Sequence, residues 1–223
     1  CLFADFCDFD DIVSSHSAES LVQLLNEIIC SFDDLSIKRG VEKIKVIGGC
    51  FFVASGIPDY REDHAEAALL FGLDLLDNIG EYNSLHNTSI QLKIGINCGS
   101  VVAGIIGTTK LLYDLWGDAV NVASRMESNC PPNRIQASEF AYAELKHLYK
   151  FEHRGFIQIK GKGKLKAYLF KSAREIKPLI SHELTSAELK KGVNNKGNLN
   201  ASTRRMSFAS HHSQMTDYSI ANG

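Results

Sequence analysis

The sequence predicts an α+β domain built on a ferredoxin-like βαββαβ core with C-terminal additions. Three observations predict it. Apolar runs of strand length alternate with two long stretches in which apolar residues recur every three or four positions. The glycine pair Gly48-Gly49 separates two strand-like runs and indicates a hairpin. Further strand-like and helical stretches follow on the C-terminal side.

Each expected element has its own signal. Residues 1–6 are a short apolar run suited to a buried strand, and residues 17–33 show helical spacing with Ser17 as N-cap. The hairpin covers residues 43–56, and a second amphipathic helix covers residues 64–79. The later elements are a strand, a glycine turn and a strand in 90–107, a helix in 119–127, and strands in 134–138 and 155–170, the last one bent at 160–163.

Charge and composition exclude several classes of protein. The 223 residues carry 24 Lys plus Arg against 26 Asp plus Glu, and this net charge of −2 argues against a nucleic-acid partner. No apolar run approaches the roughly 20 residues of a membrane helix, and no signal peptide is expected. The missing initiator Met suggests a piece of a longer chain. The six cysteines form no CxxC pair and are expected to be buried free thiols.

The composition changes near residue 171. Residues 1–171 carry the apolar periodicity of a folded domain. Residues 172–223 carry 7 basic and 4 acidic residues, are rich in Ser and Asn, and lack that periodicity. We therefore expect a disordered C-terminal tail, with room for one short helix at 186–191.

Three groups of residues suit the binding of cations or phosphates. Asp5, at the end of the first strand, can hold a hard cation, although a turn or cap aspartate has the same pattern. Asn121 and Arg125 lie four apart on one helix face and can bind an oxyanion; a solvated face with an ordinary ion pair is the alternative. Lys160 begins a run of alternating lysines and glycines that could bind a polyphosphate. The alternative is an edge strand whose lysines point into solvent. The sequence contains no P-loop.

Five motifs together resemble the catalytic domain of class III nucleotide cyclases. They are FADFCDFDD, KIKVIGG, GINCGSVVAGIIG, YDLWGDAVNVASRME and IKGKGKLKAY, which follow the family's order within residues 1 to about 170. The resemblance implies a head-to-tail dimer whose active sites lie in the interface. It also implies the reaction, in which the ribose 3′-oxygen of a nucleoside triphosphate attacks the α-phosphate and pyrophosphate leaves, with two magnesium (or manganese) ions bound.

The resemblance also implies roles for individual residues. Lys45 and Asp114 match the pair that recognises adenine. Asn121 matches the residue that orients the ribose, and Arg125 matches the residue that stabilises charge at the α-phosphate. Lys160 matches the lysine that binds the terminal phosphates.

One departure from the family pattern decides the interpretation. Asp5 matches the first metal aspartate, but Gly49 stands where metal-binding members carry the second. The chain therefore looks like the second-type domain of a two-domain adenylyl cyclase, which brings base recognition and transition-state groups to a metal-carrying first-type partner. Its substrate would be ATP, and magnesium would be bound mainly by the partner. A guanylyl cyclase half and a catalytically silent regulatory domain stay open as alternatives.

The resemblance extends to location and control. Many two-domain members are membrane-bound, so we expect a cytosolic domain of a membrane-bound parent, with no membrane insertion by this fragment. The segment Arg204-Arg205-Met206-Ser207-Phe208 resembles substrates of cyclic-AMP-dependent kinase. Ser207 is therefore a candidate for feedback phosphorylation.

Overall fold

The structure is a computed structural model of the chain and describes residues 1–159 and 163–174. Several sequence predictions fall outside the described residues. They are Lys160, the helix at 186–191 and the phosphorylation candidate Ser207.

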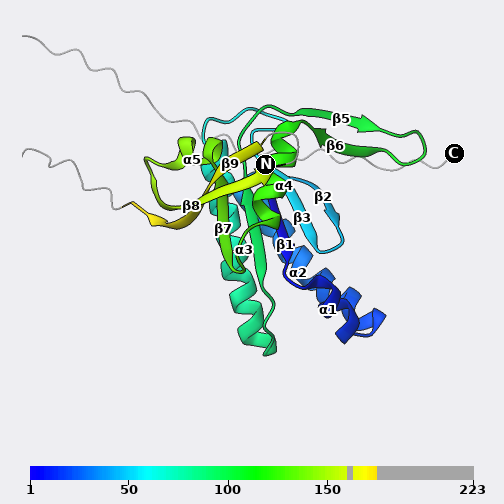
Figure 1. The fold of residues 1–223 in the computed structure, drawn as a ribbon. Coiled ribbons are helices and arrows are strands. Elements are labelled where there is room, and N and C mark those ends of the chain that lie inside the picture. Colours follow the sequence, from blue (N-terminus) through cyan, green and yellow to red (C-terminus); the bar gives the residue numbers. More distant parts are fainter. Residues whose placement is uncertain (160–162, 175–223) are drawn as a thin grey trace, which may run out of the picture. The chain divides into compact units, whose positions relative to one another are not determined.

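The core is a ferredoxin-like arrangement inside a seven-stranded sheet, with the strand order β2-β3-β1-β4-β7-β9-β8 (Figure 1). Strand β1 lies between β3 and β4 and is antiparallel to both, and β3 is antiparallel to β2. This confirms the predicted βαββαβ core. Its elements are β1 (Leu2–Phe6), α2 (Ala18–Arg39), β2 (Glu42–Ile47), β3 (Cys50–Ala54), α3 (His64–His86) and β4 (Leu92–Ile96).

Helix α2 shows how local sequence fixes the ends of an element. The Ser17 side chain accepts a hydrogen bond from the Ser20 N–H, which confirms the predicted N-cap. At the other end Gly40 adopts a left-handed conformation with φ 62°, and its N–H binds the carbonyls of the last turn. Both long helices extend further than predicted, α2 to Arg39 and α3 to His86. The apolar stripe continues into these extensions, since Leu35 of α2 and Tyr82 of α3 pack against the core.

The C-terminal additions extend the sheet and place one helix against it. Strand β7 joins β4 in parallel, and β9 and β8 follow in antiparallel pairing. The segment predicted as one bent strand in 155–170 is therefore parts of two antiparallel strands. The added elements are α4 (Asp118–Ser128), β7 (Arg134–Ser138), α5 (Glu139–Leu145), β8 (Tyr149–Ile159) and β9 (Gly163–Ala173).

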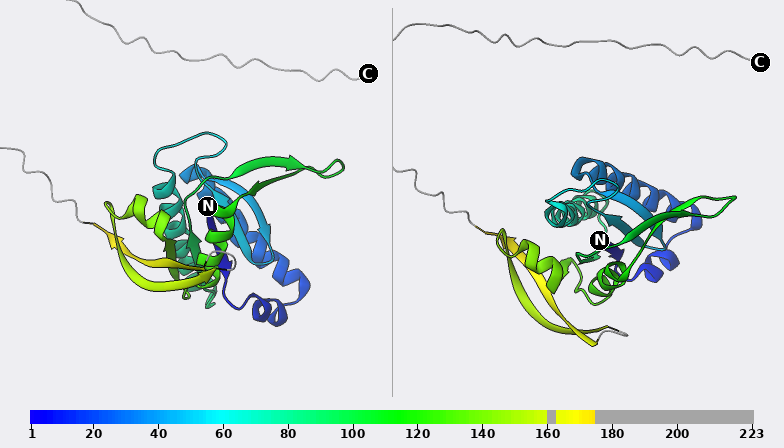
Figure 2. Two further views of the ribbon diagram at one scale, coloured as in Figure 1. Left: turned by 45° about the horizontal axis from the view of Figure 1, so that its top comes forward. Right: turned by 90° about the horizontal axis from the view of Figure 1, so that it is seen from above.

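A separate hairpin projects from the body of the domain (Figures 1 and 2). It consists of β5 (Val102–Ile106) and β6 (Leu112–Trp116), paired antiparallel, and we call it the arm. Sequence analysis did not predict β6, nor α5, nor the short helix α1 (Phe9–Ser15) that follows β1.

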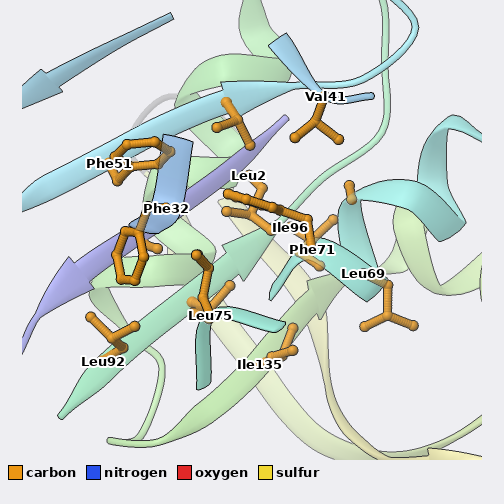
Figure 3. Packing of buried hydrophobic residues seen from close by; sticks show 14 of the residues in the cluster. Leu2, Phe32, Val41, Phe51, Leu69, Phe71, Leu75, Leu92, Ile96 and Ile135 are labelled. Carbon is orange, nitrogen blue, oxygen red and sulfur yellow. The ribbon is translucent and has the colours of Figure 1, made fainter. Parts of the chain in front are cut away.

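The two faces of the sheet differ. Strand β1 directs Leu2, Ala4 and Phe6 toward α2 and α3, where all three are buried in the main apolar cluster (Figure 3). We call this side the α2/α3 face. The alternate residues Phe3 and Asp5 point to the opposite side, which α4 and the base of the arm partly cover, and which we call the α4 face.

The cysteines only partly follow the prediction. Cys7 and Cys130 are buried free thiols. Cys30 is exposed, because it lies two positions from the buried Ile28 and Phe32 and so on the outer side of α2. In the described part of the chain, no helix has the length and hydropathy needed to cross a membrane.

Candidate active site

Two charged residues from distant parts of the chain meet at the base of the arm. Lys45 of β2 donates from Nζ to Oδ2 of Asp114 of β6 at 2.5 Å, across 69 positions of sequence. The Leu115 N–H donates to Asp114 Oδ1 at 2.8 Å. Burial opposes ionisation of Asp114, but these two donors outweigh it and hold the pKa of Asp114 below its ordinary value. The structure thus brings together the pair that the sequence singled out.

A β-bulge at Ile44 directs Lys45 toward Asp114. The pairing of β2 with β3 shifts register between Lys43 and Lys45, so Ile44 is an extra residue in β2. Without it, Lys43 and Lys45 would lie on the same face, since strand side chains alternate. Lys43 instead binds Asp33 of α2 at 2.6 Å, on the α2/α3 face. The bulge therefore places only Lys45 on the α4 face.

A pocket of about 810 Å³ lies between β2 and the arm. Lys45 and Asp114 both line it, together with apolar surface from Ile44, Pro58 and Leu112. Its volume is in the range of small-molecule sites. One cationic donor beside one anionic acceptor, in a partly apolar pocket, can hydrogen-bond a planar heterocycle that presents an acceptor next to a donor.

Helix α4 presents the other predicted pair. Its residues Ala119, Val122 and Met126 are buried against the sheet, whereas Asn121 and Arg125 are both exposed on the outer face. The one-face prediction is confirmed. Of the alternative interpretation, the solvated face is present, but within the described residues no ion pair of the Arg125 guanidinium with an acidic side chain is seen. The guanidinium is therefore available to an anion from outside the domain.

The alternative interpretation placed Asp5 at a turn or a cap, and the structure contradicts it. Asp5 is inside β1, opposite Cys50 of β3 and Lys93 of β4. Burial raises the pKa of Asp5, and the Lys93 charge and the Phe6 N–H oppose that rise. The positive charge that acts on this carboxylate in the structure is therefore that of Lys93, on the neighbouring strand.

The space beside Gly49 does not fit the second metal carboxylate that the family pattern places there. A Cβ built on Gly49 would lie 2.6 Å from a ring carbon of Phe9, so the α1 residue Phe9 fills the space that a second carboxylate needs. Burial, with the carboxylates of Asp5 and Glu127, raises the pKa of the Cys50 thiol to about 12, so Cys50 supplies no thiolate. The described residues contain no cluster of three or more metal-ligating side chains.

Glu127, near the end of α4, is a buried acid that sequence analysis missed. It is 5% exposed, and its Oε1 has no hydrogen-bond partner in the described part of the chain. Burial and the Asp5 carboxylate raise its pKa to about 7, against the effect of Lys93. Its position four residues after Ala123, on the apolar stripe of α4, is the signal that could have identified it.

Comparison with known proteins identifies the family of this chain. The family model described as the adenylate and guanylate cyclase catalytic domain matches residues 1–172. An adenylate cyclase of Mycobacterium tuberculosis is 40% identical over 167 residues, which are 75% of this chain and 38% of that protein. Adenylate cyclase type 9 of Xenopus laevis is 37% identical over 195 residues, covering 81% of this chain and 15% of that protein. The chain thus spans well under half the length of these relatives.

A solved structure extends the likeness to the fold. The guanylate cyclase domain of RhGC from Catenaria anguillulae, in complex with GTP, superposes with a TM-score of 0.74 at 32% identity. The match covers 78% of this chain and 95% of that domain. Adenylate and guanylate cyclases are thus both similar to this chain. The chain belongs to the adenylate and guanylate cyclase catalytic domain family, the class III nucleotide cyclases.

Proposed function

We propose that the chain is the second-type catalytic domain of a two-domain adenylyl cyclase, converting ATP to cyclic AMP and pyrophosphate at an interface with a first-type domain. The contact between Lys45 and Asp114 carries this proposal. The two side chains are already 2.5 Å apart and line one pocket, so base recognition needs no rearrangement to assemble them.

The chemistry of the pair suits adenine. The adenine edge presents a ring-nitrogen acceptor beside an amino donor, and Lys45 can only donate while ionised Asp114 can only accept. Guanine reverses both groups. Its ring nitrogen carries an N–H donor, and a carbonyl acceptor takes the place of the amino group. In this arrangement it would leave buried groups unpaired, at a cost of about 1–3 kcal/mol for each group.

Helix α4 supplies the residues proposed for the reaction itself. The ribose 3′-oxygen bonds to the α-phosphorus, the bond from that phosphorus to the pyrophosphate oxygen breaks, and the hydroxyl proton is released. Negative charge builds on the α-phosphate oxygens, where the exposed guanidinium of Arg125 would stabilise it, while Asn121 orients the ribose. We assign Lys160 to the terminal phosphates from the motif alone.

The proposed partner is a first-type cyclase domain that holds the metal. Class III cyclases generally use magnesium or manganese, and Gly49, Phe9 and Lys93 make this chain's own site unsuited to it. The arm offers a surface for such a partner. Several large apolar side chains of the arm are exposed to solvent in the single domain, and a partner could cover them. They are Val102, Ile105, Ile106, Leu111 and Leu112.

We further propose that the domain is cytosolic within a membrane-bound parent. The proposal comes from the family resemblance, in which two-domain members are commonly membrane-bound. The near-balanced charge of the chain agrees with a small-molecule substrate and a protein partner rather than nucleic acid.

The test is to reverse donor and acceptor at the base pocket. The Lys45→Glu, Asp114→Cys variant is mixed with a metal-carrying first-type domain, and kcat/KM is measured for ATP and for GTP. We expect the ATP-to-GTP ratio to fall by about 10-fold or more, as two mismatched groups imply. Lys150→Glu is the control, because it reverses the charge of an exposed lysine on β8 that does not line the pocket, and it should leave the ratio unchanged.

Each alternative has its own outcome in this experiment. An unchanged ratio in the double variant would show that neither residue reads the base. A wild-type preference for GTP would identify a guanylyl cyclase half. Nucleotide binding without turnover of either substrate would identify a silent regulatory domain.

A further inference from the structure

Two buried amide side chains tie helix α4 to the sheet. Asn97, directly after β4, donates from Nδ2 to the carbonyl of Ala119 in the first turn at 2.9 Å. Gln136, in the middle of β7, donates from Nε2 to the carbonyl of Met126 in the last turn at 2.7 Å. Asn97 is 2% exposed and Gln136 is 0% exposed. Both bonds are therefore shielded from water.

Helix α4 packs directly against strand β4. The helix touches β4 where a Cβ on Gly95 would overlap the backbone nitrogen of Glu127, so backbone lies directly on backbone. The buried stripe combines two alanines with Val122 and Met126, which pack in an apolar cluster with residues of β8. At its start the helix follows Gly117, which provides no side-chain cap. Hydrogen bonds to helix carbonyls add a directional restraint on the register of α4 to these apolar contacts, which are not directional.

Each amide is itself held in one orientation. The Ser138 hydroxyl accepts from the Ala141 N–H and donates to Asn97 Oδ1 at 2.5 Å. Asn97 must therefore present its nitrogen to the helix. Gln136 Oε1 accepts from the guanidinium of Arg154 on β8, which leaves its nitrogen for the helix in the same way. The orientation of both donors is thus built into the sheet.

We propose that Asn97 and Gln136 are positioning residues for the cyclase reaction. The inference rests on the proposed roles of Asn121 and Arg125, which lie between the two anchored carbonyls. The anchors are seven residues apart, about two helical turns, so together they fix both the rotation and the axial position of α4. A misplacement of a reacting group by about 1 Å can cost on the order of 10²-fold in rate.

The test separates positioning from binding and from stability. The whole chain carrying Gln136→Met, which keeps the side-chain length but removes the donor, is mixed with a metal-carrying first-type domain. We expect kcat with ATP to fall about tenfold and KM to stay within about twofold, because register matters most in the transition state. Asn97→Leu should behave in the same way.

Asn83→Leu is the matched control. Asn83 donates from Nδ2 to the Ile90 carbonyl at 2.8 Å, the same kind of bond at the far end of α3. Its loss should lower stability and leave kcat unchanged. Should Gln136→Met fail to fold, Gln136→Glu keeps the length and the contact with Arg154 and removes the donor to Met126, and the same fall in kcat is expected.

A second measurement does not depend on cyclase activity. Hydrogen exchange of the α4 amides should be faster in Gln136→Met than in the wild type, with α3 unchanged, and Asn83→Leu should show no effect in α4. An unchanged kcat, a change in KM alone, an equal kcat loss in Asn83→Leu or unaltered α4 exchange would overturn the proposal. A different outcome would separate the two proposals. If α4 exchanges faster in Gln136→Met but the wild-type mixture forms no cyclic AMP, the anchoring is upheld and the proposed function is rejected.

Discussion

The α2/α3 face and the α4 face are made by the same strands but solve different problems. Within β1, Leu2, Ala4 and Phe6 are 0–3% exposed beneath two long helices. Their neighbours Phe3 and Asp5 are only partly buried, beside a shorter helix and the base of the arm. One face is closed by the domain itself, and the other stays incomplete.

The difference shows where stability and chemistry are separated. The α2/α3 face buries large apolar side chains against each other, which stabilises the fold. The α4 face carries a buried acid, the ion pair between Lys45 and Asp114, and exposed cationic and amide groups on α4. Half-buried charge and an exposed apolar arm are features expected of a face that a second domain completes.

The largest effect is expected from opening a cavity on the α2/α3 face. Phe71 is 0% exposed and packs on Phe51 with ring centroids 6.2 Å apart. Phe71→Ala should reduce the free energy of unfolding by about 3–5 kcal/mol, measured by denaturant titration. The kcat of protein that is still folded should be nearly unchanged. A loss below about 1 kcal/mol would show that this face does not carry the stability of the domain.

A smaller effect, with a pH dependence, is expected from Glu127 on the α4 face. Its pKa is raised from 4.5 to about 7, so the folded state binds the proton more tightly than the unfolded state. Stability therefore falls as pH rises between these two values, and the penalty is absent below about pH 4.5. Glu127→Gln should be more stable than the wild type at pH 8 by up to about 3 kcal/mol, with no difference below pH 4.5.

Urea titrations from pH 4 to pH 8 check this prediction. Glu81→Gln, on the exposed side of α3, is the control and should change stability equally little at every pH. If Glu127→Gln matches the wild type across the whole range, Glu127 is not a buried, unpaired acid.

Arg125→Ala should separate function from stability most cleanly. The side chain is exposed and unpaired among the described residues, so the free energy of unfolding should be unchanged. In the complex with a first-type domain, kcat should fall on the order of 10²-fold with little change in KM. A change confined to KM would reassign Arg125 to ground-state binding.

Much of the fold followed from periodicity, and the exceptions have physical reasons. The long helices and the hairpin had clear apolar repeats. Helices α1 and α5 are seven residues each, and α1 buries none of its side chains, so neither shows a sustained apolar stripe. Strand β6 is apolar except for Asp114, which interrupts the run, and it pairs only within the arm, so it lacks the regular alternation of a strand on a buried sheet.

Less of the site could be predicted from the residues themselves. Lys45 and Asp114 were identified only through the family resemblance, since nothing local indicates the bulge at Ile44 that turns Lys45 toward the arm. Asn97 and Gln136 were missed because their partners are backbone carbonyls of a helix distant in sequence. A lone amide within an apolar strand, as in Arg134–Ser138, is the signal that could have found Gln136.

The central claim is that this chain is one half of an active site. The most direct test measures cyclic AMP formed from ATP by the purified chain, by a metal-carrying first-type domain, and by their mixture. Because position 49 is a glycine and Phe9 fills the space beside it, the family's second metal carboxylate is missing from this chain. We therefore predict negligible turnover by this chain alone and robust turnover by the mixture. Robust turnover by this chain alone, or a mixture no more active than its parts, would contradict the account.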